Sequence, residues 1–359
     1  MSCTFLFTQA TIIASDRSSA MNKLRSMLKY CDLNGIIPQF TKCEFLVVNG
    51  TEDDRAPLPF GNTFLKCVEF ILLLGSHLTS LASIAEEARL HMKKRYTSVI
   101  KYYNFLRSNR SAPLKVKTKV LQSCVMSSLL HNCEAFGSHV PKDLETSYVK
   151  LLRSCFNTRS NVPNAILFIE SGFLPIRTII MMRQYNFYKR FRDSIQAGSR
   201  REKMMQMLLG RKTDYLQHYE DLVEKYASVS EILAESSNEL KQKIYRLANA
   251  GHYKYQIYVK LNPELLPSPF LSIVHPVALD IVKFRLGSHY LPIETGRWSR
   301  KPRNERFCTN CGVLGDEDHV LFHCSLIQRN DIQLDVISKL WYQPEVYRLF
   351  SRIKDAKYL

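Results

Sequence analysis

Residues 308–324 read Cys308-Thr-Asn-Cys311-Gly-Val-Leu-Gly-Asp-Glu-Asp-His319-Val-Leu-Phe-His-Cys324. Two cysteines separated by two residues can bind one metal ion from a single tight turn, and the glycine directly after the pair suits such a turn. His319 and Cys324 supply the second pair of donors, which completes a tetrahedron of three sulfurs and one nitrogen. The segment therefore predicts a small zinc knuckle, with Cys308, Cys311, His319 and Cys324 as its ligands.

The predicted zinc ion is structural, because four protein ligands leave no position for a water molecule or a substrate. Its binding would supply local folding free energy on the order of 10 kcal/mol, as in zinc-finger peptides. His323 is the alternative histidine ligand, but it adjoins Cys324, and adjacent residues coordinate one ion awkwardly. A neighbouring acid could accept the proton of the free ring nitrogen of His319. The candidates are Asp316, Glu317 and Asp318.

The composition of the whole chain is globular. It has 359 residues, of which 45% are hydrophobic and 11% aromatic, and this length allows two or three domains. The formal net charge is +17. Such an excess predicts attraction to polyanions, with nucleic acid first and an acidic membrane surface second. The alternative is a basic surface that is simply solvated.

Positive charge is concentrated in three segments. Residues 89–119 contain ten Lys or Arg and no acid, residues 177–212 contain ten against two acids, and residues 297–306 contain five against one. Aromatic residues interleave with the first two runs, which suits single strands or hybrid duplexes because rings stack on bases. At helical spacing such rings also form cores, so both interpretations stay open. The candidate contacts to RNA, DNA or an RNA–DNA hybrid are Lys93, Lys94, Arg95, Lys101, Lys115, Lys117, Lys119, Arg297, Trp298, Arg300, Lys301 and Arg303.

The other cysteines indicate a reducing compartment. The sequence has ten cysteines, and the seven outside residues 308–324 are scattered, most of them through apolar stretches, as reduced buried cysteines are. The apolar N-terminal run has no basic residue before it, so it is a poor signal peptide, and no apolar stretch approaches a membrane span. We expect an intracellular protein of the nucleus, the cytoplasm or both, with no membrane partner.

The N-terminal part predicts a small α+β unit. Residues 5–15 have the pattern of a strand or hairpin, and Asp16 can cap a helix that continues to about Cys31 and ends at Asn34-Gly35. Residues 44–48 and 69–74 have the pattern of further strands, whereas residues 49–60 are rich in turn formers.

From about residue 78 onward the pattern is helical, so the fold class is α+β and predominantly α-helical. Helices are predicted over residues 84–106, 113–136, 141–157 and 176–194, and near 203–209, 215–226, 231–248 and 276–286. A break at residues 196–201 and a cluster of prolines at residues 263–269 mark boundaries. The predicted regions are therefore 1–77, 78–195, 196–268 and 269–359.

The residues around the cysteine cluster resemble a known family. The stretch Phe284-Arg285-Leu286-Gly287, followed by Gly296-Arg297-Trp298 and then by the cluster, resembles the C-terminal end of non-LTR (LINE-type) retrotransposon reverse transcriptases, which carry a CCHC zinc motif. Residues 6–15 resemble the strand–turn–strand of that family's catalytic centre, and residues 70–79 its primer-grip hairpin. Residues 114–137 resemble the helical region that follows. The resemblance implies a palm remnant over 1–77, a thumb-like basic helical region over 78–195, a helical linker region over 196–268 and a zinc module over 269–359.

The same resemblance implies that the catalytic centre is degenerate. Gln9 and Ala10 occupy the positions of the family's two aspartates, which hold divalent metal ions at the reacting atoms. A glutamine amide is a weaker ligand than a carboxylate and alanine is none, so Mg²⁺ is not expected to bind and no catalytic residue is assigned. Lys42 matches a lysine that protonates the leaving pyrophosphate in such polymerases, and without metal ions it is equally well a surface lysine.

Three functions are compatible with these features. The first is a truncated or degenerate reverse transcriptase product that binds nucleic acid through its basic helices and zinc knuckle without polymerising. The second is an RNA-directed DNA polymerase that acts as part of a longer product. The third is a zinc-stabilised scaffold that binds protein, and salt separates it from the first because phosphate contacts weaken steeply as salt rises.

Overall fold

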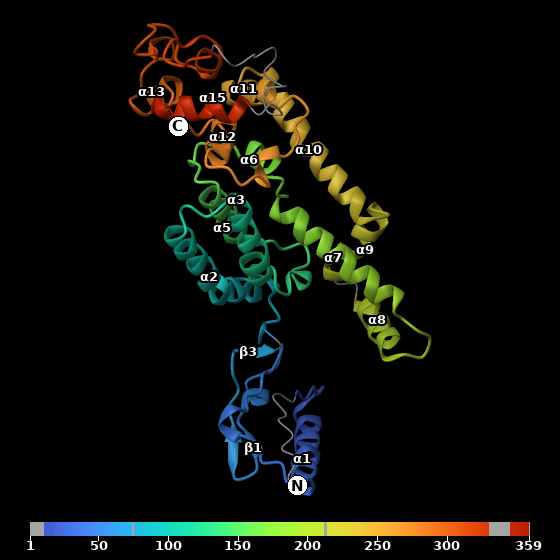
Figure 1. Cartoon of the computed structure of the whole chain (residues 1–359). Helices are drawn as coiled ribbons and strands as arrows, with labels where there is room; N and C mark the ends of the chain where they lie inside the picture. The colour runs from blue at the N-terminus through green and yellow to red at the C-terminus, as the bar shows by residue number, and fades with distance from the viewer. Residues whose placement is uncertain (1–10, 74, 212–213, 330–344, 359) are drawn as a thin grey trace. The chain divides into compact units, whose positions relative to one another are not determined.

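The computed structural model describes residues 11–73, 75–211, 214–329 and 345–358 (Figure 1). The chain is a predominantly α-helical α+β protein with two small antiparallel sheets, which confirms the predicted fold class. It divides into two compact units, Met1–Lys93 and Lys94–Leu359. The four regions named above, which have other boundaries, stay a prediction.

The first helix of the N-terminal unit, α1 (Arg17–Leu33), begins and ends where the sequence predicts. The Asp16 carboxylate accepts the backbone N–H of Ser19 at 2.8 Å, which satisfies one of the free donors at the start of the helix. Asn34 ends the helix, and Gly35 follows with a φ of +64°, a conformation that glycine adopts without strain. Local signals alone therefore determine both ends of α1.

A two-stranded sheet packs against α1. The strands β1 (Leu58–Phe60) and β2 (Thr63–Leu65) pair antiparallel, and their buried residues Leu58, Phe60 and Leu65 contact the apolar face of α1. The last three residues of the turn-rich segment 49–60 thus form a strand that the sequence did not indicate. Pro59 is compatible with β1 because a two-stranded sheet consists of edge strands, in which a missing N–H is tolerated.

The second sheet is a hairpin of β3 (Phe70–Leu73) and β4 (Ser76–Thr79), so the strand predicted near residues 69–74 is confirmed. The strand predicted over residues 44–48 is wrong, because only an isolated bridge joins Phe45 to Cys67. Of the strand or hairpin predicted over residues 5–15, residues 5–10 lie outside the described residues and residues 11–14 have no regular structure.

Helix α2 (Ile84–Ser108) matches its prediction, but the single helix predicted over residues 113–136 is wrong. The chain forms α3 (Leu114–Val120), a π-helical turn (Leu121–Met126) and α4 (Ser127–Leu129), and Asn132 then takes a left-handed conformation with φ +58°. The hydroxyls of Ser123 and Ser127 donate to carbonyls four residues earlier, at 2.8 and 2.6 Å. Such bonds compete with the helical backbone pattern and accompany the break.

The remaining helices of the second unit pack through buried apolar clusters. The rings of Tyr185 and Tyr188 are buried against other helices, so these two aromatic residues of the basic run belong to the core. The helices are α5 (Lys142–Cys155), α6 (Asn164–Ser171), α7 (Ile176–Asp193), α8 (Arg200–Arg211), α9 (Asp214–Lys225), α10 (Val229–Asn249), α11 (Tyr253–Leu261), α12 (Ala278–Arg285), α13 (Pro292–Trp298) and α15 (Glu345–Asp355).

A buried ion pair joins three of these helices. Arg285 of α12 donates from Nε and Nη2 to the two carboxylate oxygens of Glu170 in α6, at 2.6 and 3.0 Å. The hydroxyl of Tyr258 in α11 donates to the same carboxylate at 3.0 Å. The side chains of Arg285 and Glu170 are only 3% and 0% exposed, so the pair has left water almost completely.

Among the described residues, no single helix is both long enough and apolar enough to cross a membrane; α6 and α7 reach that length and composition only together, across a bend of 60°.

Candidate metal centre and its basic surroundings

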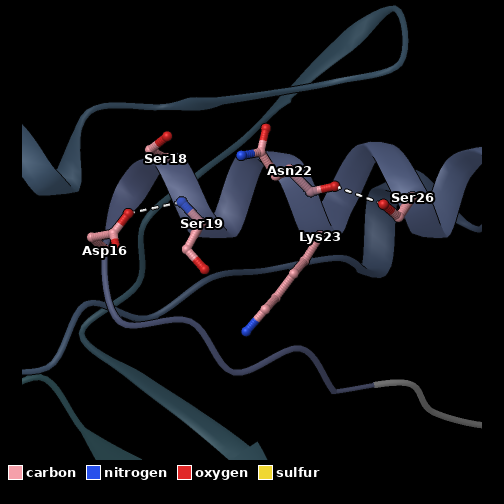
Figure 2. A pocket seen from close by; sticks show the side chains of 6 residues that line it. All are labelled: Asp16, Ser18, Ser19, Asn22, Lys23 and Ser26. Atoms are coloured by element: carbon pink, nitrogen blue, oxygen red, sulfur yellow. Dashed lines mark hydrogen bonds between the residues drawn. The ribbon is translucent and has the colours of Figure 1, made fainter.

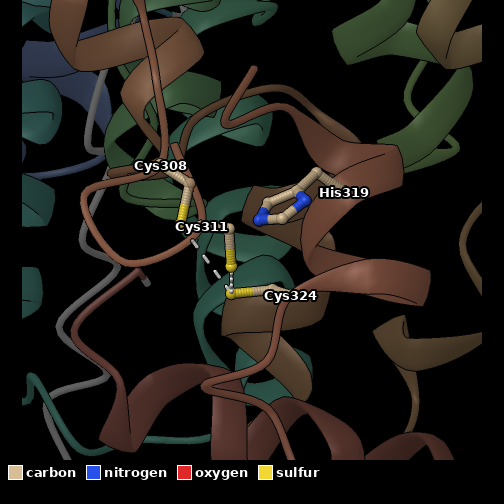
Figure 3. Close-up of side chains that lie close together, drawn as sticks. All are labelled: Cys308, Cys311, His319 and Cys324. Atoms are coloured by element: carbon tan, nitrogen blue, oxygen red, sulfur yellow. Dashed lines mark hydrogen bonds between the residues drawn. The ribbon is translucent and has the colours of Figure 1, made fainter. Parts of the chain in front are cut away.

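The four predicted ligands come together in space. One donor atom from each of Cys308, Cys311, His319 and Cys324 lies within 4.8 Å of the others (Figure 3). His319 begins a π-helical turn (His319–His323), and Cys324 follows its last residue. Cys308, His319 and Cys324 are buried and Cys311 is half-buried, so the donors converge in an interior site that can hold a metal ion.

A tight turn holds the first two cysteines. The backbone N–H of Gly312 donates to the Cys308 carbonyl at 2.9 Å, and the Cys308 N–H donates to the Val313 carbonyl at 2.7 Å. An antiparallel bridge between Phe307 and Leu314 closes the base of this turn. Gly312 has a φ of +68°, which is strained for residues with a Cβ atom, so the glycine after the cysteine pair has the role that the sequence indicates.

His319, rather than His323, belongs to the cluster. The Nε2 atom of His319 is buried and has no hydrogen-bond partner in the described part of the protein, which is costly unless another group occupies its lone pair or proton. His323 is exposed and lies outside the cluster. An orphaned ring nitrogen beside three sulfurs fits a metal ion as the missing partner.

The three acids before His319 have other partners than its ring. Asp316 accepts the backbone N–H of His319 at 3.0 Å, Glu317 accepts the hydroxyl of Tyr253 at 2.6 Å, and Asp318 pairs with Lys260. The expectation that one of them bonds the His319 ring is therefore not met among the described contacts. Burial alone would raise the pKa of Glu317, but the bonded ring of His289 and the Tyr253 hydroxyl outweigh it, so the pKa is lowered.

The sulfurs lie close enough to repel each other as thiolates. Cys324 Sγ is 3.9 Å from both Cys308 Sγ and Cys311 Sγ. Hydrogen bonds from the side chain and backbone of Ser325 lower the pKa of the Cys311 thiol to about 6, whereas burial raises the pKa of Cys324. A cation among the sulfurs would stabilise the charged form of all three, as metal binding to thiols requires.

Arg329 supports the cluster, although the sequence alone did not identify it as a functional residue. Its guanidinium donates to the carbonyls of Val320, Leu321, Cys324 and Ile327 at 2.5 to 2.9 Å. The first three of these carbonyls belong to the turn that carries His319 and Cys324. No local sequence signal marks this role, because it depends on the chain folding back over the turn.

The knuckle also packs against residues 297–306, the basic segment that precedes it. The Gly315 N–H donates to the Arg306 carbonyl at 2.9 Å, and the Ile293 N–H of α13 donates to the Gly315 carbonyl at 3.0 Å. A Cβ atom on Gly315 would lie 2.6 Å from Pro292 Cγ and 3.0 Å from the Cys308 nitrogen, so only glycine permits this close packing. The turn that carries Cys308 and Cys311 and helix α13 therefore form one packed module.

Five candidate nucleic-acid residues lie exposed on this module, namely Arg297, Trp298, Arg300, Lys301 and Arg303. The guanidinium of Arg159 lies 3.8 Å from the centroid of the Trp298 ring and 4.5 Å from that of Tyr290. Trp298 remains 50% exposed, so its ring is both supported and accessible. Arg159 is 139 residues from Trp298 in the chain, and no sequence pattern connects them.

The candidates on α2 and α3 differ in exposure. Lys93, Lys94, Lys101, Lys115 and Lys119 are exposed, and Arg95 is half-buried. The prediction that Lys117 contacts nucleic acid is wrong, because Lys117 is 6% exposed and its Nζ donates to the Arg110 carbonyl at 2.8 Å. Burial lowers the pKa of this amine. Lys117 therefore stabilises the start of α3 instead of presenting charge to a ligand.

Of the three residues tied to polymerase chemistry, only Lys42 lies in the described part of the chain. Gln9 and Ala10 lie outside the described residues, and Lys42 is exposed in a short 3-10 turn (Phe40–Lys42).

A surface depression of about 550 Å³ lies along the first turns of α1 (Figure 2). It is lined by Asp16, Ser18, Ser19, Asn22, Lys23 and Ser26. The bond from the Ser19 backbone lowers the pKa of Asp16, which agrees with its role as a helix cap.

No protein family, curated protein or solved structure matches this chain.

Proposed function

We propose that the cluster binds zinc and that the surrounding basic module binds nucleic acid. A zinc tetrahedron with Zn–S bonds of about 2.3 Å has sulfur–sulfur edges of roughly 3.8 Å. The two distances of 3.9 Å between the sulfurs fit this value closely. Three thiolates with one imidazole and no open position are the donor set of a structural zinc site.

The observation that carries the nucleic-acid proposal is the packing of the basic segment onto the knuckle. The Arg306 guanidinium donates to the carbonyls of Ile293 and Lys301, at distances of 2.8 to 3.0 Å, and so ties the segment to the start of α13. The cations at Arg300, Lys301 and Arg303 and the exposed ring of Trp298 thus project from one scaffold. Cations beside an accessible ring suit a strand with phosphates and unstacked bases.

In this proposal the chain is a degenerate LINE-type reverse transcriptase product of the intracellular, reducing compartment. The resemblance of the N-terminal part and the CCHC order of the ligands support it, as does the net charge of +17. The free thiols outside the cluster, such as Cys31, Cys133 and Cys155, support the compartment. The partner is RNA, DNA or a hybrid duplex, and Mg²⁺ has no role.

Binding to a labelled single-stranded oligonucleotide should weaken steeply with salt. The double variant Arg300→Gln/Lys301→Gln removes two exposed cations, so the slope of log K against log salt should fall by about 1.4, at roughly 0.7 per phosphate contact on a single strand. Fluorescence anisotropy at several salt concentrations measures this slope. The matched control is Lys142→Gln/Lys150→Gln, which removes two exposed cations of α5.

Equal slopes for the two double variants would contradict the assignment of the interface to the knuckle module. Oligonucleotide binding that does not depend on salt would contradict phosphate contacts as its basis, because such contacts release counterions. Absence of oligonucleotide binding would favour the protein-binding scaffold.

The chain by itself should not extend a primer. An RNA template with an annealed DNA primer, incubated with nucleotides and Mg²⁺ or Mn²⁺, should yield no product, because Gln9 and Ala10 cannot hold the two metal ions. The same sample should retain the template in a binding assay, which separates loss of chemistry from loss of folding. Clear extension by the 359-residue chain would overturn the proposal that it is catalytically degenerate.

A further inference from the structure

A cavity of about 300 Å³ lies beside the knuckle, within the second unit. Its lining includes four cations, Lys254, Arg297, Arg303 and Arg306, and one carboxylate, Glu294. The formal charges therefore sum to four positive against one negative. A cavity of this size is at the lower limit for small-molecule sites, so it can take a group of nucleotide size but no duplex.

The one carboxylate of the lining already accepts bonds from neighbouring side chains. Glu294 is 1% exposed, and its oxygens accept from Lys254 at 3.2 Å, from Arg297 at 3.1 Å and from Asn161 at 3.1 Å. Its charge is thereby used in fixing two of the cations in place. The excess positive charge of the lining has no acid of the cavity to neutralise it.

The other two arginines are held without a carboxylate. The Arg306 guanidinium donates only to backbone carbonyls in the contacts described. The Arg303 guanidinium lies 4.0 Å from the centroid of the Tyr253 ring, and Arg303 is exposed. Both side chains keep donors that a phosphate could use, and guanidinium groups match phosphate oxygens in pairs.

The rings of His252, Tyr253 and Tyr255 also line the cavity. The hydroxyl of Tyr253 is anchored on buried Glu317 at 2.6 Å, so this ring is fixed in position. Aromatic faces beside cations are the elements with which proteins hold unpaired bases and their phosphates. The cavity combines both in a space for one nucleotide.

We propose that this cavity binds a single unpaired nucleotide of the nucleic acid, either at a strand end or looped out of a duplex. Its phosphate lies among Arg297, Arg303 and Arg306, and its base lies against the ring of Tyr255. The inference rests on the proposed function, since it names the part of the strand that the knuckle module recognises. It explains why the cavity has rings as well as cations.

The test uses the full chain with bound zinc and measures whether adenosine monophosphate displaces a labelled single-stranded oligonucleotide. Adenosine monophosphate should compete better than inorganic phosphate, because only the nucleotide reaches the rings. Arg303→Gln should weaken its binding about tenfold, the order expected for one lost charge-assisted hydrogen bond. The matched control Arg192→Gln removes an exposed arginine of α7 outside the cavity and should leave binding of the nucleotide unchanged.

Three results would overturn the inference. If adenosine monophosphate fails to displace the oligonucleotide while the oligonucleotide still binds with a steep salt dependence, the proposed function stands and only the cavity is excluded. Inorganic phosphate that competes as well as the nucleotide excludes recognition of the base. Equal effects of Arg303→Gln and Arg192→Gln exclude the cavity as the site. Absence of any oligonucleotide binding contradicts the proposed function itself.

Discussion

Replacing Cys324 with serine is expected to release the metal ion and unfold the knuckle. The Cys324 sulfur lies 3.9 Å from the sulfurs of both Cys308 and Cys311, so its loss removes one of the four donors that converge in the cluster. Metal binding supplies local folding free energy on the order of 10 kcal/mol, more than a few buried apolar side chains can replace. Metal content by mass spectrometry and thermal unfolding with and without a chelator measure the effect.

Matched residues separate this effect from a general loss of stability. Cys124→Ser removes an exposed cysteine outside the cluster and should leave the metal content unchanged. His319→Ala should lose the ion, whereas His323→Ala, four residues further on, should keep it. Retention of zinc by His319→Ala together with its loss from His323→Ala would show that the ligand assignment is wrong.

Replacing Arg285 with methionine should destabilise the second unit by about 3–5 kcal/mol, the usual cost of leaving one charge of a buried ion pair alone. The Glu170 carboxylate, 0% exposed, would keep the Tyr258 hydroxyl as its partner but lose both bonds from the guanidinium. Urea unfolding followed by circular dichroism measures the free energy. Because the pair joins α6 to α12, the loss should appear in the unfolding of the whole unit.

Arg177→Met is the matched control for this variant. Arg177 also pairs with a glutamate of another helix, Glu145, but its side chain is 54% exposed. Exposed pairs contribute about 0–1 kcal/mol, so this variant should unfold almost as the original chain does. A cost for Arg285→Met no greater than for Arg177→Met would contradict the role of the buried pair. The double variant Glu170→Leu/Arg285→Met should recover part of the loss, because it leaves no buried charge.

Features that depend on a few neighbouring residues could be predicted from the sequence. The N-cap at Asp16, the end at Asn34 and Gly35, and the helices after Pro141 and Pro175 follow from backbone chemistry within one turn. The metal ligands belong to the same class. Two pairs of donors at short spacing can meet around one ion whatever the rest of the chain does.

Features that depend on distant residues could not be predicted. Lys117 lies in a basic run, and only its burial under the turn near Arg110 shows that it binds a carbonyl. The break at Leu121–Met126 follows helical residues, yet the chain leaves the α-helical pattern there. Composition and periodicity identify the type of each side chain, whereas the tertiary structure determines which group that side chain contacts.

The sequence by itself determined the cluster of three cysteines and one histidine, the helical fold class and the basic character of the chain, because short-range geometry and net charge do not require knowledge of the fold. Only the tertiary structure decided which cations are available and what surrounds them. It brought Arg159 beneath Trp298, Glu170 onto Arg285, and Lys254 to the cavity beside the knuckle. Arg159 and Trp298 are 139 positions apart in the chain, and Glu170 and Arg285 are 115 apart. The packing of whole helices creates these contacts.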